Sequence, residues 1–127
     1  MNFDSLADYG FKEDYAEFTV ADVSTEMVAH QLTEMQTGTS YILKEVRVYM
    51  PGTVGNKAYL RMNEAATDDA ATKIGGTPYQ AGAFLVWDGD ANGKLGRFLS
   101  TKPYVQVCKG AGSDVQDVEG VCHYYYK

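Results

Sequence analysis

The chain contains little cysteine, histidine, tryptophan or proline, and it has no long apolar run. Its 127 residues include two cysteines, two histidines, one tryptophan and three prolines. Two cysteines are too few for a disulfide framework, so we expect Cys108 and Cys122 to be small buried thiols, with a cross-strand bridge as the alternative. No stretch reaches the roughly 18 apolar residues of a membrane-spanning helix, and no secretion signal opens the sequence. We therefore expect one domain with a single core and no membrane partner.

Basic charge is scarce relative to acidic charge, and the imbalance is local. Residues 1–26 contain seven acidic residues and one lysine, which accounts for the whole formal net charge of −6. The other residues carry equal numbers of acidic and basic side chains, so they have no basic excess with which to attract phosphates. Because nucleic-acid binding uses such an excess to displace counterions, the sequence predicts no nucleic-acid partner.

Alternation of apolar and polar residues is what the chain has in abundance. The stretch 41–50 (YILKEVRVYM) is rich in β-branched and aromatic residues and ends at a Pro-Gly pair. Ile42, Val46 and Val48 fall on one face, which Lys44 interrupts, and Leu43 is the exception on the other face. Successive side chains of a strand point to opposite faces, so this pattern predicts a half-buried central strand.

Similar but shorter patterns predict the remaining strands. Residues 82–87 (GAFLVW) are apolar on both faces, which is typical of a covered central strand or of a strand at an interface. Residues 24–36 favour a short helix or an irregular turn, with a strand as the alternative, and residues 64–77 read as a long loop. Strands are also expected at 17–23, 57–63, 95–99, 103–108 and 120–126, and the last two are expected to pair as a hairpin.

Together these patterns predict an all-β fold, an antiparallel β-sandwich or jelly roll with an extended N-terminal arm. We place the arm at residues 1–16 and the β-sandwich domain at residues 17–127. The arm is acidic but carries large apolar side chains, which suit a strap lying across its own body or a neighbouring subunit, with a frayed terminus as the alternative. The side chains expected to contact a partner are Phe3, Leu6, Tyr9, Phe11 and Tyr15 on the arm, and Trp87, Tyr124 and Tyr126 on the body.

One short motif is a candidate for metal binding. Asp88, Asp90 and Asn92 match the beginning of a calcium loop, D-x-D-x-N-G, but its twelfth position is Leu99 rather than an acid. The flanking segments also read as strands, so a hairpin turn is favoured over an ion site. The adjacent Cys122 and His123 would point to opposite faces of a strand, and no nucleophile motif surrounds either cysteine. We expect no enzyme activity and no cofactor.

The order of these motifs resembles small β-sandwich virion proteins of tailed bacteriophages, among them capsid decoration (cement) proteins. The resemblance covers roughly residues 41–127, from YILKEVRVYM to KPYVQVCKGAGSDVQDVEGVCHYYYK, where a Lys-Pro-aromatic strand leads through a Gly-rich tip into a final aromatic strand. It implies a protein made in the host cytoplasm that assembles as a homotrimer in the virion and bridges subunits of the major capsid protein. The alternatives are a tail, neck or fibre component, or a glycan- or calcium-binding β-sandwich module.

Overall fold

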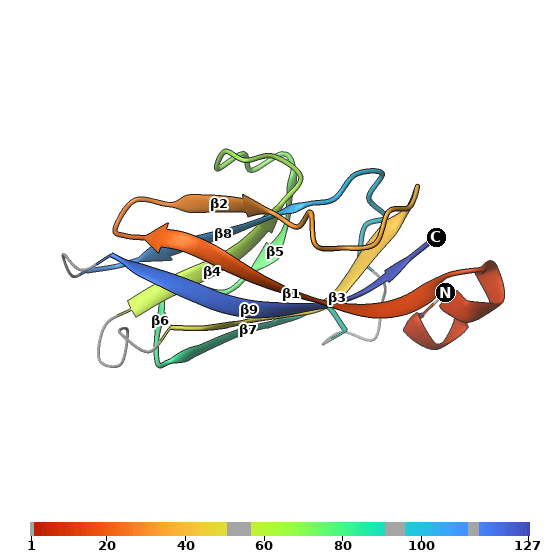
Figure 1. Ribbon diagram of the computed structural model, residues 1–127, viewed down its shortest axis with the longest axis horizontal. Coiled ribbons are helices and arrows are strands. Elements are labelled where there is room, and N and C mark those ends of the chain that lie inside the picture. The colour runs from red at the N-terminus through yellow and green to blue at the C-terminus, as the bar shows by residue number, and fades with distance from the viewer. Residues whose placement is uncertain (1, 51–56, 91–95, 112–114) are drawn as a thin grey trace.

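The computed structural model describes residues 2–50, 57–90, 96–111 and 115–127 (Figure 1). No helix among these residues is long and apolar enough to cross a membrane. The elements are the 3₁₀ helix η1 (Phe3–Tyr9) and the strands β1 (Lys12–Val23), β2 (Val28–Gln31), β3 (Tyr41–Tyr49), β4 (Lys57–Asn63), β5 (Lys73–Gly76), β6 (Gln80–Ala81), β7 (Phe84–Asp88), β8 (Tyr104–Lys109) and β9 (Gln116–Tyr126).

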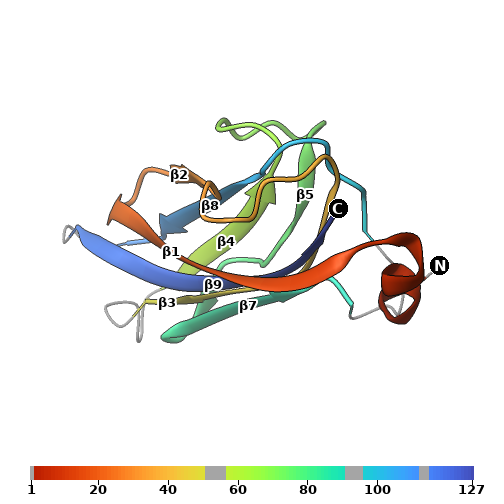
Figure 2. The ribbon, with the colours of Figure 1, turned by 45° about the vertical axis from the view of Figure 1, so that its right-hand side comes forward.

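The strands form two antiparallel sheets that pack face to face (Figure 2). Sheet A has the order β1-β9-β3-β7, and sheet B has the order β2-β8-β4-β5, with β6 paired to β4. The chain crosses between the two sheets at most connections. It alternates between them from β1 to β4, and again from β6 to β9. Two sheets wound in this way form a jelly roll. The predicted all-β, antiparallel jelly-roll fold is confirmed.

The main core lies between the two sheets. Phe18 and Val20 of β1, Val46 of β3, Leu60 of β4 and Val107 of β8 are all buried there, with at most 5% of their surface exposed. Phe18 and Val20 are two positions apart on β1, and side chains two positions apart on a strand point to the same face. Removing this apolar surface from water is the main favourable contribution to folding.

A bulge in β3 changes which face its side chains occupy. Leu43 pairs with Tyr124 and Glu45 pairs with His123, so Lys44 is an extra residue in β3. Such an extra residue shifts the alternation by one position. Leu43 therefore joins Val46 in the main core, and the prediction that Ile42 shares a face with Val46 is wrong. The two exceptions in the sequence pattern, at 43 and 44, mark this bulge.

The N-terminal stretch is folded against sheet A rather than extended away from the body (Figure 1). Phe3 and Leu6 of η1 form a second, smaller cluster with Ile42 and Tyr125 on the face of sheet A that points away from sheet B. The expected boundary at residue 17 falls inside β1, which pairs continuously with β9 from Lys12 to Val20. Helix η1 begins with a capping box between Asn2 and Ser5, a local signal that sequence analysis missed.

Four other predictions about elements differ from the structure. The strands at 103–108 and 120–126 do not form a hairpin, because β8 lies in sheet B and β9 lies in sheet A. Residues 28–31 form β2, a strand, where a helix or turn was favoured, and residues 73–76 of the expected loop form β5. In the stretch 95–99, residue 95 lies outside the described residues, and Leu99 forms only an isolated bridge with Tyr41.

Candidate protein-interaction surface

The outer face of sheet A, which points away from sheet B, is the surface on which exposed aromatic side chains gather. Strand pairing aligns its outward side chains in rows that run across β1, β9, β3 and β7. Starting near η1, these rows contain Glu13, Tyr125 and Ile42; Tyr15, His123, Glu45 and Asp88; Glu17, Val121, Arg47 and Val86; and Thr19, Glu119, Tyr49 and Phe84.

The row nearest η1 is covered by the chain itself. Phe3 packs on Tyr125 with 5.6 Å between ring centroids, and Leu6 is completely buried. The Tyr125 hydroxyl donates a hydrogen bond of 3.1 Å to Glu13 Oε2. Burial raises the pKa of Tyr125 to about 12, and its hydrogen bond to Glu13 adds to that shift. This end of the face is therefore covered by the chain itself, and the Tyr125 hydroxyl has its hydrogen-bond partner within the chain.

The next row carries a stacked Tyr–His pair. Tyr15 is 60% exposed and stacks on His123 with ring centroids 4.2 Å apart. His123 Nε2 lies 2.9 Å from Glu13 Oε1. Burial acts to raise the pKa of Glu13, but the hydrogen bonds from His123 and Tyr125 outweigh it, so this pKa lies below its ordinary value. These contacts hold the first part of β1 against β9.

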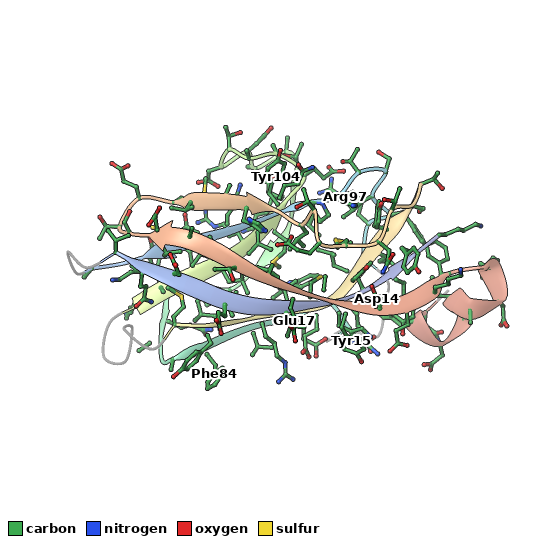
Figure 3. The ribbon with its side chains drawn as sticks, viewed as in Figure 1. Asp14, Tyr15, Glu17, Phe84, Arg97 and Tyr104 are labelled. Atoms are coloured by element: carbon green, nitrogen blue, oxygen red, sulfur yellow. The ribbon has the colours of Figure 1, made fainter. Side chains whose placement is uncertain are left out.

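The far end of the face carries the Phe84 patch, which we define as Tyr49, Phe84 and Val86. Phe84 is 67% exposed, and its ring lies 4.9 Å from that of Tyr49 between centroids. Phe84 and Val86 come from β7, the edge strand of sheet A. Figure 3 shows Phe84 and Tyr15 along the lower margin of the molecule, on the side of sheet A away from sheet B. A wide groove of about 820 Å³ runs from this patch across β3 and β9 to β1.

The outer face of sheet B, in contrast, is covered by the long connection after β4. Asn63 Nδ2 donates to the Asp69 carbonyl at 2.9 Å, and Gln106 Nε2 donates to the Thr67 carbonyl at 2.8 Å. Arg61 forms an ion pair of 2.7 Å with Asp68. These bonds hold the loop onto its own sheet, so Asn63 and Gln106 are buried although they point away from the core.

The structure brings together only some of the residues that the sequence singled out. Tyr9 and Tyr15 are exposed, Phe11 and Tyr126 are half-buried, and Phe3 and Leu6 are buried under their own chain. Tyr124 is completely buried, where its hydroxyl donates to Asp14 and accepts from the Gln36 N–H, so it offers no contact surface. Trp87 points inward and packs against the main core.

Sequence analysis did not mark the Phe84 patch as a contact. The signal was present, because the doubly apolar stretch 82–87 is the one strand whose outward face is apolar as well. The stretch alone left open whether a second layer of the same chain covers that face. The structure answers this, because β7 is an edge strand with Phe84 and Val86 exposed.

Neither the cysteines nor the calcium-like motif forms a reactive centre among the described residues. Cys108 and Cys122 are both buried and free, as the first of the two alternatives predicted. Burial raises the pKa of Cys122, which keeps it a neutral thiol, and His123 lies on the opposite face of β9. Asp88 Oδ1 accepts the Asp90 N–H at 2.9 Å, as in a turn, and residue 92 lies outside the described residues. No three acidic, histidine or cysteine side chains among the described residues are grouped to hold a metal ion.

Comparison with known proteins finds similarity of fold alone. No protein-family model matches the sequence, and no curated protein matches it. Among solved structures, the coat protein of Tobacco streak virus is similar with a TM-score of 0.53 and 12% identity, covering 91% of this chain and 86% of that one. The STIV MCP is similar with a TM-score of 0.55 and 12% identity, covering 91% of this chain and 41% of that one.

A third similar structure comes from outside the viruses. Bacillus endospore appendages, described as a family of disulfide-linked pili, match with a TM-score of 0.51 and 7% identity over 92% of this chain and 88% of that one. At such low identity the likeness shows a shared architecture and no shared activity. The chain thus has the jelly-roll β-sandwich fold that is also found in viral capsid proteins.

Proposed function

We propose that this protein is a non-enzymatic structural component of a virus particle, of the capsid decoration type. It attaches to subunits of the major capsid protein and stabilises the shell by bridging them. Three observations support this: the resemblance of residues 41–127 to phage virion proteins, the fold that is shared with viral coat proteins, and the exposed aromatic surface of sheet A.

The Phe84 patch is the observation on which the proposal rests. Phe84, Tyr49 and Val86 are 67%, 44% and 41% exposed, although they adjoin one another on two paired strands. Contiguous exposed apolar residues on a folded domain mark contact sites for other proteins or membranes. Aromatic side chains are also enriched at protein interfaces, where they contribute large contact areas.

The N-terminal segment contributes to the proposed contact in two ways. Tyr9 and Tyr15 are exposed and extend the aromatic surface toward η1. Phe3 and Leu6 hold η1 against Tyr125, and they would reach a neighbouring subunit only if η1 left this position. A strap that exchanges between subunits would use the same anchors in both places.

A homotrimer is the oligomer that the proposal implies, because the phage proteins that the sequence resembles often occur as trimers on their shells. Light scattering of the purified protein tests this part separately. A trimeric mass supports it, whereas a monomeric mass at all concentrations would remove the trimer while leaving shell binding to be measured on its own.

Shell binding is tested by co-sedimentation of the protein with capsids that lack it. Phe84→Ser is expected to weaken binding, because it removes the largest exposed apolar side chain of the patch. Phe98→Ser is the matched control, because Phe98 is 45% exposed and lies beside Phe11, away from the patch. Equal binding of both variants and the wild type would overturn the assignment of this surface.

Imaging of labelled particles distinguishes the shell from other places in the virion. Label spread over the capsid supports the decoration role. Label confined to the tail, neck or fibre would replace it with a structural role at that position, using the same surface. A glycan-array signal that Phe84→Ser abolishes, without any binding to particles, would instead favour a carbohydrate-binding module.

A further inference from the structure

The groove beside the Phe84 patch combines an apolar end with an acidic end. Tyr49, Phe84 and Val86 lie at the β7 side, and Glu17 and Glu119 lie at the β1 and β9 side. Glu17 and Glu119 form no ion pair among the described residues, whereas Arg47 of β3 pairs with Glu45. Among the described residues that line the groove, the one cation is therefore engaged within β3, and two carboxylates have no ion-pair partner.

The spacing of these groups is set by the sheet. Phe84, Tyr49 and Glu119 are directly opposed across β7, β3 and β9. Neighbouring strands lie about 4.8 Å apart, so Phe84 and Glu119 are separated by about 10 Å along the row. A chain in the polyproline II conformation rises about 3.1 Å per residue with three residues per turn, so side chains three positions apart share a face and lie about 9 Å apart along such a row.

Charge argues against a second copy of this chain as the occupant. The chain carries a net charge of −6, and the described lining of the groove contains Glu17, Glu34 and Glu119 with Arg47 as its one cationic side chain. Two such surfaces brought together would place like charges in contact, which disfavours association. A cationic partner would instead find complementary charge there.

We propose that this groove binds a segment of another protein in the polyproline II conformation, in which a large apolar side chain is followed, three residues later, by Lys or Arg. The apolar side chain packs on Phe84 and Tyr49, and the cation pairs with Glu119, with Glu17 next to it on the β1 side. This inference rests on the proposed function, because it names the chemistry of the capsid segment that the same surface would contact.

The probe is a blocked eight-residue peptide with leucine and, three positions later, arginine in a serine–glycine background. Titration into ¹⁵N-labelled protein is followed by amide chemical shifts. We expect shifts confined to residues around Tyr49, Phe84, Val86 and Glu119. A peptide with glutamate in place of arginine, or with serine in place of leucine, is expected to bind at least several-fold more weakly.

Matched variants of the protein separate the two halves of the groove. Phe84→Ser is expected to raise the dissociation constant about tenfold, because it removes most of one aromatic contact. Phe98→Ser is expected to leave the constant unchanged. Glu119→Lys is expected to weaken the arginine peptide and strengthen the glutamate peptide, a reversal that a general loss of folding cannot produce.

Several outcomes would overturn the inference. These are no shifts with the arginine peptide, equal binding of the arginine and glutamate peptides, or binding that survives Phe84→Ser. Patch shifts that depend on protein concentration alone would assign the groove to a second copy, and shifts caused by sugars instead of the peptide would assign it to a glycan. If the peptide fails while Phe84→Ser still weakens shell binding, the proposed function stands and the peptide chemistry is wrong.

Discussion

The two ends of the outer face of sheet A differ in one respect, which is whether the chain covers its own apolar residues. Near η1, Ile42 and Tyr125 are buried beneath Phe3 and Leu6. At the other end, Tyr49, Phe84 and Val86 have no such cover from the described residues and remain exposed. The outer face of sheet A therefore has one apolar area that helix η1 covers and another that stays exposed. The open end is the surface that we propose another molecule covers.

Deletion of residues 1–10 is the strongest way to break this difference. It removes both anchors of η1 but leaves β1, which begins at Lys12, in place. We expect a loss of about 5 kcal/mol in the free energy of unfolding, from the size of two buried side chains. Urea denaturation measures the loss, and binding of a fluorescent hydrophobic dye to the uncovered Ile42 and Tyr125 should rise. An unchanged unfolding midpoint would show that η1 does not close this end.

Leu6→Ala tests the covered end with a single side chain. Leu6 is completely buried, so its truncation is expected to cost about 3 kcal/mol in unfolding free energy. Tyr9→Ala is the control on the same helix, because Tyr9 is 54% exposed and should change stability by no more than about 0.5 kcal/mol. Equal effects of both substitutions would contradict the burial seen here.

Glu13→Gln tests the hydrogen bonds beside the covered end through their pH dependence. The folded-state pKa of Glu13 is lowered, so its carboxylate contributes stability above the ordinary value near 4.5, and this contribution is lost as the pH falls through the folded pKa. The wild type should therefore melt above Glu13→Gln at pH 6, and the difference should shrink below pH 4.5. Melting curves between pH 3 and pH 7 measure it. A difference that grows toward low pH would have the wrong sign.

Phe84→Ser should have the smallest effect on stability, which sharpens the comparison. Because 67% of Phe84 is already exposed, we expect a change of no more than about 0.5 kcal/mol in unfolding free energy. Urea denaturation beside Leu6→Ala measures both ends of the face under one set of conditions. A loss as large as that of Leu6→Ala would mean that Phe84 packs within its own chain and is not held for a partner.

Strand positions could be predicted where local alternation is strong, but strand partners could not. Residues 57–63 were predicted as a strand and form β4 with those bounds. For residues 28–31 a strand was only the alternative to a helix or turn; all four side chains of β2 are half-buried, so the strand has no buried and exposed face to produce a clear alternation. The segments that form β8 and β9 follow one another across a Gly-rich connection, a pattern that also fits a hairpin. Their placement in different sheets depends on packing across the core, which local sequence does not reveal.

The sequence indicated that an exposed apolar surface exists, but it identified only some of the residues that form it. An apolar contact surface on a β-sandwich was expected, and the stretch 82–87 carried its signal. Tyr124 was misplaced because neighbouring tyrosines of a terminal strand look alike in sequence, while the structure buries Tyr124 between Asp14 and Gln36. Which end of the face η1 would cover depends on contacts between residues far apart in the chain, such as Phe3 with Tyr125.

The bulge at Lys44 determines which side chains at the beginning of β3 face helix η1. In a regular strand without the bulge, the alternation would run unbroken from Val48 through Lys44, so Ile42 would turn into the sandwich while Tyr41 and Leu43 turned out. Helix η1 would then lie beside different side chains of β3, and the cluster around Tyr125 would lose Ile42. The bulge in β3 thus decides whether Ile42 is on the outer face, where helix η1 packs against it.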